Sequence, residues 1–311
     1  MFDSPLSASA YEVLGVDPQT PEHELRRAFR TRLRQTHPDA GGDATAFIRV
    51  QHAWELVGTP AARAAYDRGH GFSTASDQPR WDGWRPPPPP GDTRPRARSA
   101  GTPGGQHRTQ YVQLLRELHG AEIDPYDPVV VRTAPVHLRR LLADALAEEA
   151  TARAVSALGM GFTVWHDVAA GAGGASGTDA AGAKLDHIVL GPAGLYGIAS
   201  EDFGDTVRFR RGEIIGRGVA DREPVAELLA AMRTIARAAR VRFSGALIVA
   251  PDDDLHRAIE DLGAIRGIPV AVVSRSALAT VLRRGVPGAR VIGGNEVFDV
   301  RTRLQQTVRF V

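Results

Sequence analysis

A histidine, a proline and an aspartate follow one another at positions 37 to 39, directly after an arginine-rich segment. Pro38 has no amide proton to donate, and the residue before a proline avoids helical dihedral angles. The triplet His37-Pro38-Asp39 is therefore predicted to break a helix and form a turn. An imidazole and a carboxylate beside a basic segment indicate a protein that acts on another protein.

A second set of titratable residues lies in the C-terminal half of the chain. Glu148 and Glu149 fall at the edges of the apolar stripe of a predicted helix over 135–158. Carboxylates in this position are either solvated or placed in a cleft, and the periodicity leaves both readings open. Lys184 and Asp186 flank a residue at the start of an apolar segment, so on one strand their side chains would point the same way.

The amino-acid composition limits the kinds of functional site that the chain can form. The 311 residues carry a formal charge of +2, Lys184 is the only lysine, and cysteine is absent. Without cysteine there is no disulfide, thiolate zinc site or cysteine nucleophile. The excess of arginine with alanine, glycine and proline is typical of a GC-rich bacterial genome. Residues 1–5 lack the pattern of a secretion signal and no apolar run reaches the length of a membrane span, so we expect a cytoplasmic protein without membrane contact.

Helical signals fill residues 1–70. Thr20 as cap, Pro21 and the acids Glu22 and Glu24 predict a helix that runs to Thr36. Its apolar residues recur every three or four positions, which leaves a basic strip on the other face. Further helices are predicted around Phe47–Val57 and Arg63–Asp67. The strip is formed by Arg26, Arg27, Arg30 and Arg34.

Five motifs stand in one order here: Tyr-x-x-Leu-Gly, the basic helix, His-Pro-Asp, Phe-x-x-Val-x-x-Ala-Trp and Arg-x-x-Tyr-Asp. Together they closely resemble a J-domain, the four-helix module that stimulates ATP hydrolysis by DnaK-type chaperones. The resemblance implies that His37, Pro38 and Asp39 engage the chaperone, and that Arg26, Arg27 and Arg30 meet an acidic surface on it. Arg32, Thr36 and Thr31 depart from the family, which usually has a core leucine, a tyrosine and a basic residue there.

Residues 71–134 are predicted to be a linker and connecting segment. The part from Gly71 to about Gln110 is rich in glycine, proline, serine and arginine and includes Pro86–Pro90. This composition is typical of a tether, stiff at the proline run. Contact with nucleic acid is the alternative reading, through phosphate contact and stacking. The residues concerned are Arg80, Arg85, Arg94, Arg96, Arg98, Arg108, Trp81 and Trp84.

Residues 135–311 are predicted to be an α/β domain with a mixed sheet. A long helix precedes a strand at Phe162–Trp165, and Leu185–Leu190 and Leu195–Ala199 form a hairpin around Gly191–Gly194. After Pro224–Arg240, the remainder is predicted to alternate between strand and helix, with a helix at His256–Leu262. A final strand is expected within Phe298–Val311.

The run Leu185–Ile198, with the upstream helix and Val164–Val168, resembles the nuclease-related domain of the restriction-endonuclease-like fold. That fold uses a helix glutamate, a strand aspartate and an acid-x-lysine on the next strand to hold a divalent metal and activate water. By resemblance, Glu148 (or Glu149) and Asp186 match the first two. The last pair falls on Ala199 and Glu201, so the nuclease positions are degenerate, although Lys184 could be a migrated lysine. His187 is interpreted as packing on the opposite sheet face from Asp186.

We therefore expect a J-domain co-chaperone, not an enzyme, with a nuclease-like client or targeting module that holds no cofactor or metal. The alternatives are a nuclease with Mg²⁺ or Mn²⁺ on Glu148 and Asp186, helped by Lys184 or Glu201, and an adaptor that binds nucleic acid without cutting it. The client protein and the particular DnaK-type chaperone cannot be read from the sequence.

Overall fold

The computed structural model describes residues 4–70, 95–171, 183–210, 212–219 and 222–311. It divides into two compact units. The first unit contains Met1–Pro89 and Leu115–Arg139, and the second contains Pro90–Leu114 and Arg140–Val311. Among the described residues, no helix is both long and apolar enough to cross a membrane.

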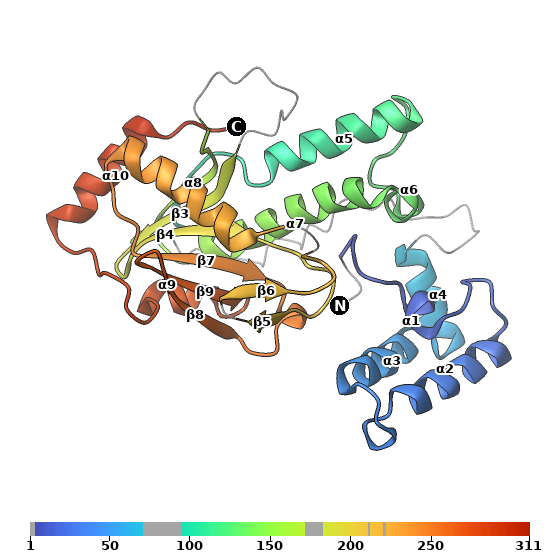
Figure 1. Ribbon diagram of the computed structural model, residues 1–311. Helices are drawn as coiled ribbons and strands as arrows, with labels where there is room; N and C mark the ends of the chain where they lie inside the picture. Colours follow the sequence, from blue (N-terminus) through green and yellow to red (C-terminus); the bar gives the residue numbers. More distant parts are fainter. Residues whose placement is uncertain (1–3, 71–94, 172–182, 211, 220–221) are drawn as a thin grey trace. The chain divides into compact units, whose positions relative to one another are not determined.

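The N-terminal part of the first unit is a small helical domain (Figure 1). Its core is formed by apolar residues from all four α-helices, among them Tyr11, Leu25, Val50 and Tyr66. The rings of Phe29 and Trp54 stack with centroids 4.4 Å apart, which joins the second helix to the third. The elements are α1 (Ala10–Leu14), α2 (Glu22–Thr36), the 3-10 helix η1 (Pro38–Ala40), α3 (Ala44–Val57) and α4 (Pro60–His70).

Arg63 on α4 ties the loop before α2 to the rest of this domain. Its guanidinium donates to the carbonyl oxygens of Pro18 and Thr20, at 2.8 Å each, and to the Tyr11 hydroxyl at 3.0 Å. The predicted helix over 21–36 is present as α2. However, Pro21 is its N-cap and no side chain caps it, so Thr20 does not have the capping role that the sequence predicted.

The second unit is built on a mixed sheet. In the described residues it has seven strands in the order β1-β2-β3-β4-β7-β9-β8. The strands are β1 (Arg98–Ala100), β2 (Thr163–Ala169), β3 (Lys184–Gly191), β4 (Gly194–Ser200), β7 (Gly245–Ala250), β8 (Ile259–Ile265) and β9 (Ile268–Ser274). Strands β2, β3 and β4 form an antiparallel meander, and β7 then pairs with β4 in parallel.

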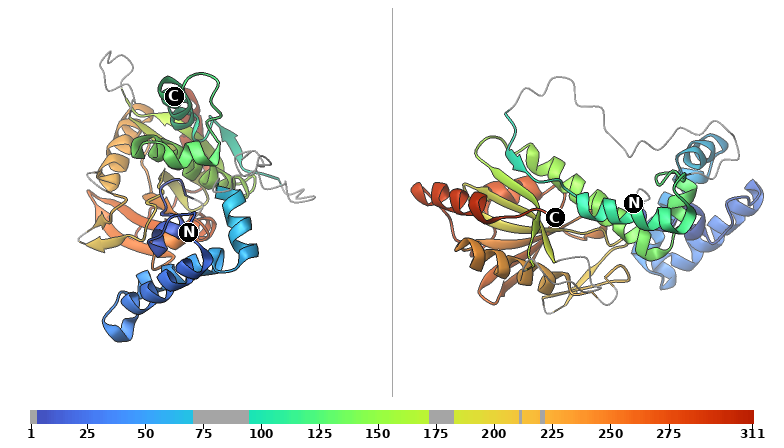
Figure 2. Two further views of the ribbon diagram at one scale, coloured as in Figure 1. Left: turned by 90° about the vertical axis from the view of Figure 1, so that its right-hand side faces the viewer. Right: turned by 90° about the horizontal axis from the view of Figure 1, so that it is seen from above.

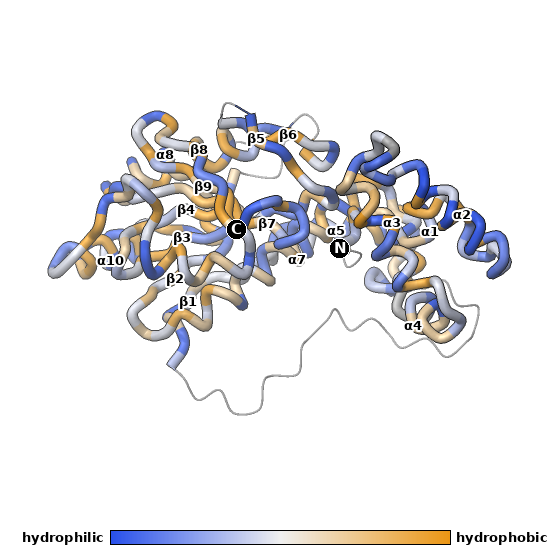
Figure 3. The backbone as a smooth tube through the Cα atoms, turned by 90° about the horizontal axis from the view of Figure 1, so that it is seen from below, coloured by the Kyte–Doolittle hydropathy of each residue, from blue (hydrophilic) through white to orange (hydrophobic). Residues whose placement is uncertain are grey.

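Helices cover both faces of this sheet (Figures 1 and 2). One apolar core joins α8 (Pro224–Ala239) and α10 (Asn295–Thr307) to the sheet through residues such as Met232 and Leu304. The other joins α7 (Val136–Ser156) and α9 (Leu278–Arg284) to the opposite face through Val155 and Leu282. The central strands are the most hydrophobic part of the trace in Figure 3. A separate hairpin consists of β5 (Arg208–Arg210) and β6 (Glu213–Ile215).

Three segments differ from the sequence prediction. Residues 71–134 contain β1, α5 (Gly105–His119) and α6 (Pro128–Thr133), where a linker and connecting segment were expected. His256–Leu262 is not a helix: Ile259–Ile265 forms edge strand β8, paired with β9 through a two-residue turn in which Arg266 and Gly267 both have positive φ. The final segment is helix α10 rather than a strand, and only a single bridge joins Phe310 to Val168.

Candidate functional site

The His-Pro-Asp turn lies at the end of α2 as predicted. His37 ends the helix with extended backbone angles, φ −63° and ψ 127°, and Pro38 opens η1. The His37 Nδ1 accepts a hydrogen bond from the Asp39 amide at 3.2 Å. Asp39 is 92% exposed, so its carboxylate is available to a partner.

Two contacts fix the direction of this turn. The His37 ring meets the Phe47 ring of α3 edge to face, with centroids 5.0 Å apart. The Gly42 amide donates to the His37 carbonyl at 3.0 Å, and a Cβ on Gly42 would lie 2.3 Å from the Thr36 carbonyl carbon. Only glycine allows this close return of the chain, so the sequence Gly41-Gly42 supports the shape of the turn.

The three arginines of the predicted chaperone surface are exposed on α2, which is among the most hydrophilic segments in Figure 3. Arg26 pairs with Glu22 at 2.7 Å, one turn earlier. Helix α2 carries five arginines against two glutamates. Exposed charges of this kind contribute little to stability but act on the rate of encounter with a charged partner.

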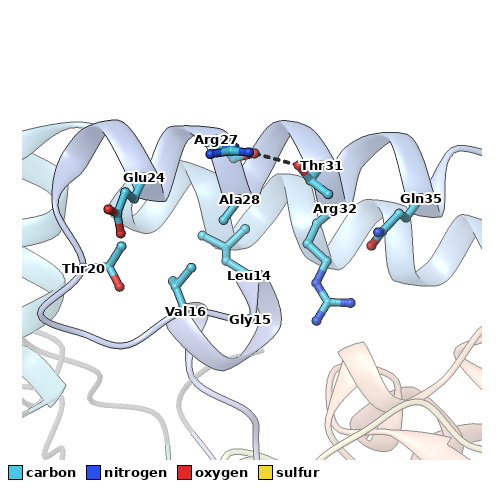
Figure 4. A pocket seen from close by; sticks show the side chains of 10 residues that line it. All are labelled: Leu14, Gly15, Val16, Thr20, Glu24, Arg27, Ala28, Thr31, Arg32 and Gln35. Carbon is cyan, nitrogen blue, oxygen red and sulfur yellow. Dashed lines mark hydrogen bonds between the residues drawn. The ribbon is translucent and has the colours of Figure 1, made fainter.

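Arg32 does not take the place of a core residue. It is exposed and lines a pocket of about 580 Å³ between α2 and the loop after α1 (Figure 4). Its guanidinium lies against Gly15, so that a Cβ at Gly15 would be 2.7 Å from Arg32 Nη2. The next residue, Leu33, packs on the core instead. This departure from the J-domain pattern therefore leaves the helix packing intact.

In the second unit, a lysine lies among three carboxylates. Lys184 Nζ is 2.7 and 2.6 Å from the two oxygens of Glu148, and 2.5 Å from Asp167 Oδ1. It is also 3.4 Å from Asp186 Oδ1. Helix α7 supplies Glu148, the end of β2 supplies Asp167, and the first residues of β3 supply Lys184 and Asp186. We call these four residues the carboxylate–lysine cluster.

The start of α5 closes one side of the carboxylate–lysine cluster. The Gly104 amide donates to Glu148 Oε2 at 3.1 Å, and the Gln106 amide donates to Asp167 Oδ2 at 3.3 Å. His107 Nδ1 lies 2.7 Å from Glu148 Oε1. Backbone amides at the beginning of a helix favour negative charge, so this segment stabilises the carboxylates that it covers.

Burial controls the proton affinities of this site. The Glu148 side chain is fully buried, and burial together with the charge of Asp186 raises its pKa. Burial and the neighbouring Lys184 ammonium lower the pKa of His107. Both effects favour the neutral imidazole.

A chain of buried polar side chains continues from this site across β2, β3 and β4. Ser99 Oγ, His166, His187, Ser200 Oγ and Thr151 Oγ1 are linked in that order by contacts of 2.8, 2.7, 3.0 and 2.9 Å. Burial lowers the pKa of His166 to about 4 and that of His187 well below its usual value. Both rings are neutral, so each nitrogen donates or accepts one hydrogen bond. His187 is thus a hydrogen-bonded residue, beyond the packing role that the sequence suggested.

The remaining nuclease-like positions are occupied differently. Ala199 packs against the core on the α8 side of the sheet. Glu201 is buried, and both of its oxygens accept from Arg222, at 2.9 and 2.6 Å. Burial raises the pKa of Glu201, whereas Arg222 lowers it. Glu149, the alternative to Glu148, lies outside the cluster and pairs with Arg108, whose Nε is 2.8 Å away.

Three of the residues considered for nucleic-acid contact lie in the described part of the chain: Arg96, Arg98 and Arg108. Arg80, Arg85, Arg94, Trp81 and Trp84 lie outside the described residues, as does Pro86–Pro90. Within the residues that are described, no group of three or more histidine, cysteine, aspartate or glutamate residues has the arrangement of a metal site.

Sequence reasoning missed Asp167, His107 and Arg222. Asp167 is a charged residue inside an apolar strand, and this was the available signal. Its positive φ of 50°, which helps to turn its carboxylate toward Lys184, could not be read from the sequence. The Gly104-Gly105 pair before His107 was interpreted as part of a linker, although it is the start of α5.

Comparison with known proteins identifies the N-terminal domain. Residues 9–67 match the model of the DnaJ domain family. The chain is 43% identical over 70 residues to the chaperone protein DnaJ of Roseiflexus sp. (strain RS-1), covering 21% of this chain and 19% of that protein. It is 34% identical over 86 residues to the chaperone protein DnaJ of Dictyoglomus thermophilum, covering 26% and 22%. The chain thus spans about a fifth of the length of these curated relatives.

Residues 9–67 are therefore a J-domain, the module shared with DnaJ-type chaperone proteins. The chain also contains the mixed α/β sheet unit, whose strands lie outside the matched residues 9–67.

Proposed function

We propose that this protein is a J-domain co-chaperone that stimulates ATP hydrolysis by a DnaK-type chaperone. The observation that carries the proposal is an intact His-Pro-Asp turn within a matched J-domain, with Asp39 exposed and His37 held against Phe47. A turn that is braced from behind loses little conformational entropy when it binds. Its polar groups are thus already oriented for the chaperone.

The basic face of α2 would bring the two proteins together. Arg26, Arg27 and Arg30 are exposed, and their charges act over about 10 Å at 0.1 M salt. They would steer an acidic surface of the chaperone toward the adjacent His-Pro-Asp turn. In this mechanism the arginines set the rate and orientation of encounter, and the turn triggers hydrolysis.

The decisive test of the J-domain mechanism is single-turnover ATP hydrolysis by a DnaK-type chaperone. We expect His37→Gln in the full chain to reduce stimulation to within about twofold of the unstimulated rate, because the imidazole at the turn is lost. His23→Gln, the same change on an 81% exposed side chain of α2, should keep full stimulation. Equal stimulation by both variants would refute the mechanism.

We further propose that the second unit is a nuclease-like module without catalytic activity, which holds a client or target. The support is the position of these residues: Glu148 lies on helix α7, Asp186 lies on β3, and Ala199 and Ser200 end β4, with Glu201 directly after it. At the degenerate pair, Ala199 has no ligand atom and Glu201 is neutralised by Arg222. Tethered to the J-domain, this unit would make delivery of the client to the chaperone local.

A metal-dependent nuclease is the second candidate, because Lys184 lies beside both Glu148 and Asp186. The observed arrangement does not fit a metal, since the Lys184 ammonium lies between the carboxylates that would hold it. A gel assay distinguishes these candidate functions. The full chain and its Asp186→Ala variant are each incubated with DNA and Mg²⁺ or Mn²⁺, and the DNA is examined for cleavage and retardation. Cleavage lost in the variant would establish the nuclease, a retarded but uncut band would favour a nucleic-acid adaptor, and unshifted DNA would favour a protein client.

A further inference from the structure

The Lys184 ammonium has the contacts that a bound cation would have. It touches both oxygens of Glu148 and one oxygen of Asp167 within 2.7 Å, and Asp186 at 3.4 Å. An ammonium has three N–H donors, so these near contacts use its full donor capacity. Lys184 is therefore a central member of the carboxylate–lysine cluster.

The cluster is closed to solvent. The side chains of Lys184, Glu148, Asp167 and Asp186 are 7%, 0%, 1% and 14% exposed. Charges buried to this extent must be compensated by a partner of opposite sign. Because Lys184 is the only lysine in the chain, it supplies the only side-chain ammonium.

Other donors also contact these carboxylates, at the two Glu148 oxygens that Lys184 contacts and at the second oxygens of Asp167 and Asp186. The Gly104 amide and His107 contact Glu148, the Gln106 amide contacts Asp167, and the Ser200 amide donates to Asp186 Oδ2 at 2.7 Å. A divalent ion would need oxygens at about 2.0–2.6 Å. In this arrangement the oxygens converge only on the place that Nζ occupies, so a metal and the ammonium exclude each other.

We propose that Lys184 is a permanent internal cation that replaces a divalent metal, and that removing its charge converts Glu148, Asp167 and Asp186 into a divalent-cation site. The inference uses the nuclease-like proposal only for the comparison with a metal, and it is independent of the J-domain mechanism. It accounts for three buried carboxylates in a chain that has Ala199 and Glu201 at the positions of the acid-lysine pair.

The test is a titration of the full-length protein with Mn²⁺, followed by thermal unfolding and by electron paramagnetic resonance of the free ion. For the native chain we expect a change in Tm within about 1 °C at 1 mM Mn²⁺ and no saturable binding. Lys184→Met should melt lower in EDTA, because three buried carboxylates lose their cation. Mn²⁺ should then raise its Tm by at least about 5 °C and bind at one ion per chain.

Two further variants make the result specific. Lys184→Met/Glu148→Gln should lose the Mn²⁺ response, since it removes a charged ligand. In Lys184→Met/Asp167→Asn, the loss of one carboxylate charge offsets the loss of the ammonium charge. This double variant provides a folded reference if Lys184→Met alone does not fold. Saturable Mn²⁺ binding by the native chain that Asp186→Asn abolishes would overturn the proposal, and so would a folded Lys184→Met protein that binds no Mn²⁺. Neither result would alter the outcome of the ATPase test.

Discussion

At the scale of single residues, the acidic side chains inside the second unit differ in whether a cationic side chain pairs with them. Asp144 lies one turn before Glu148 on α7, and its Oδ1 has no hydrogen-bond partner among the described residues. Burial, and then the charge of Glu201, raises the pKa of Asp144 to about 7, although Arg222, His107 and Arg140 oppose the shift. Glu201 forms two hydrogen bonds with Arg222, whereas no such bidentate partner contacts Asp144 in the part of the chain that the structure describes.

The raised pKa of Asp144 predicts that the stability of this unit falls as pH rises from about 4 to 7. The folded state binds the Asp144 proton more tightly than the unfolded state, so the penalty is absent below pH 4 and complete above pH 7. Asp144→Asn should therefore raise the free energy of unfolding at pH 8 by about 1–3 kcal/mol and leave it nearly unchanged at pH 4. Urea unfolding at both pH values measures this, and an equal effect at both would contradict the assignment.

At the scale of elements, the turn that leads from β1 to α5 positions the donors that cover the carboxylate–lysine cluster. Gly101 has φ +87°, and a Cβ there would lie 2.1 Å from the His166 carbonyl oxygen of β2. Gly104 has φ +70°, with Ala145 of α7 in the way of a side chain. The turn thus passes between a strand and a helix at distances that only glycine permits.

We predict that Gly101→Ala destabilises the second unit by at least about 2 kcal/mol, through the left-handed backbone and the clash with β2. Gly161→Ala is the matched control, because Gly161 is exposed and nothing lies within 4 Å of its added Cβ. That change should cost no more than about 0.5 kcal/mol. Hydrogen exchange of the β2 and β3 amides reports on this unit alone. Similar protection in the two variants would show that the turn tolerates a side chain.

The periodic elements could be predicted from the sequence, and the elements that depend on distant partners could not. Helices α2 and α8 and strands β3, β4 and β7 have clear apolar spacing over their own length. Strand β8 is an edge strand with four of its seven residues exposed, and its apolar positions are too few to distinguish a strand from a helix. The sequence predicted that the side chains of Lys184 and Asp186 point the same way if both lie on one strand, and β3 contains both residues. The contacts of His107 and Asp167 depend on how α5 and β2 meet α7, which local patterns do not specify.

At the scale of the whole molecule, the chain joins a J-domain that has a basic helix to a larger α/β unit that also pairs charged side chains in its interior. Helix α2 exposes Arg26, Arg27 and Arg30. In the second unit, Lys184 and Arg222 form ion pairs with the buried carboxylates of Glu148 and Glu201. The proposed function assigns encounter with the chaperone to the J-domain and contact with the client to the second unit.

Charge reversal tests the encounter step. Arg26→Glu/Arg27→Glu/Arg30→Glu should slow association with the chaperone on the order of 10-fold at 50 mM salt, and much less at about 500 mM, because salt screens the steering. Arg208→Glu/Arg210→Glu/Arg217→Glu makes the same change in net charge at exposed positions of the second unit and should leave the rate unchanged. Stopped-flow mixing measures both. Equal slowing would mean that only the net charge matters.

Because the chain has a single lysine, the chemical reactivity of that side chain can be followed without adding a label. Although burial lowers the pKa of Lys184, the carboxylates of Asp186, Glu148 and Asp167 raise it above its ordinary value. A protonated, buried amine does not attack an acylating reagent, so the side chain at position 184 reacts only when the carboxylate–lysine cluster opens. Because the rest of the chain has no lysine side chain, acylation at this position would report the opening of that cluster in the native sequence, with no engineered label.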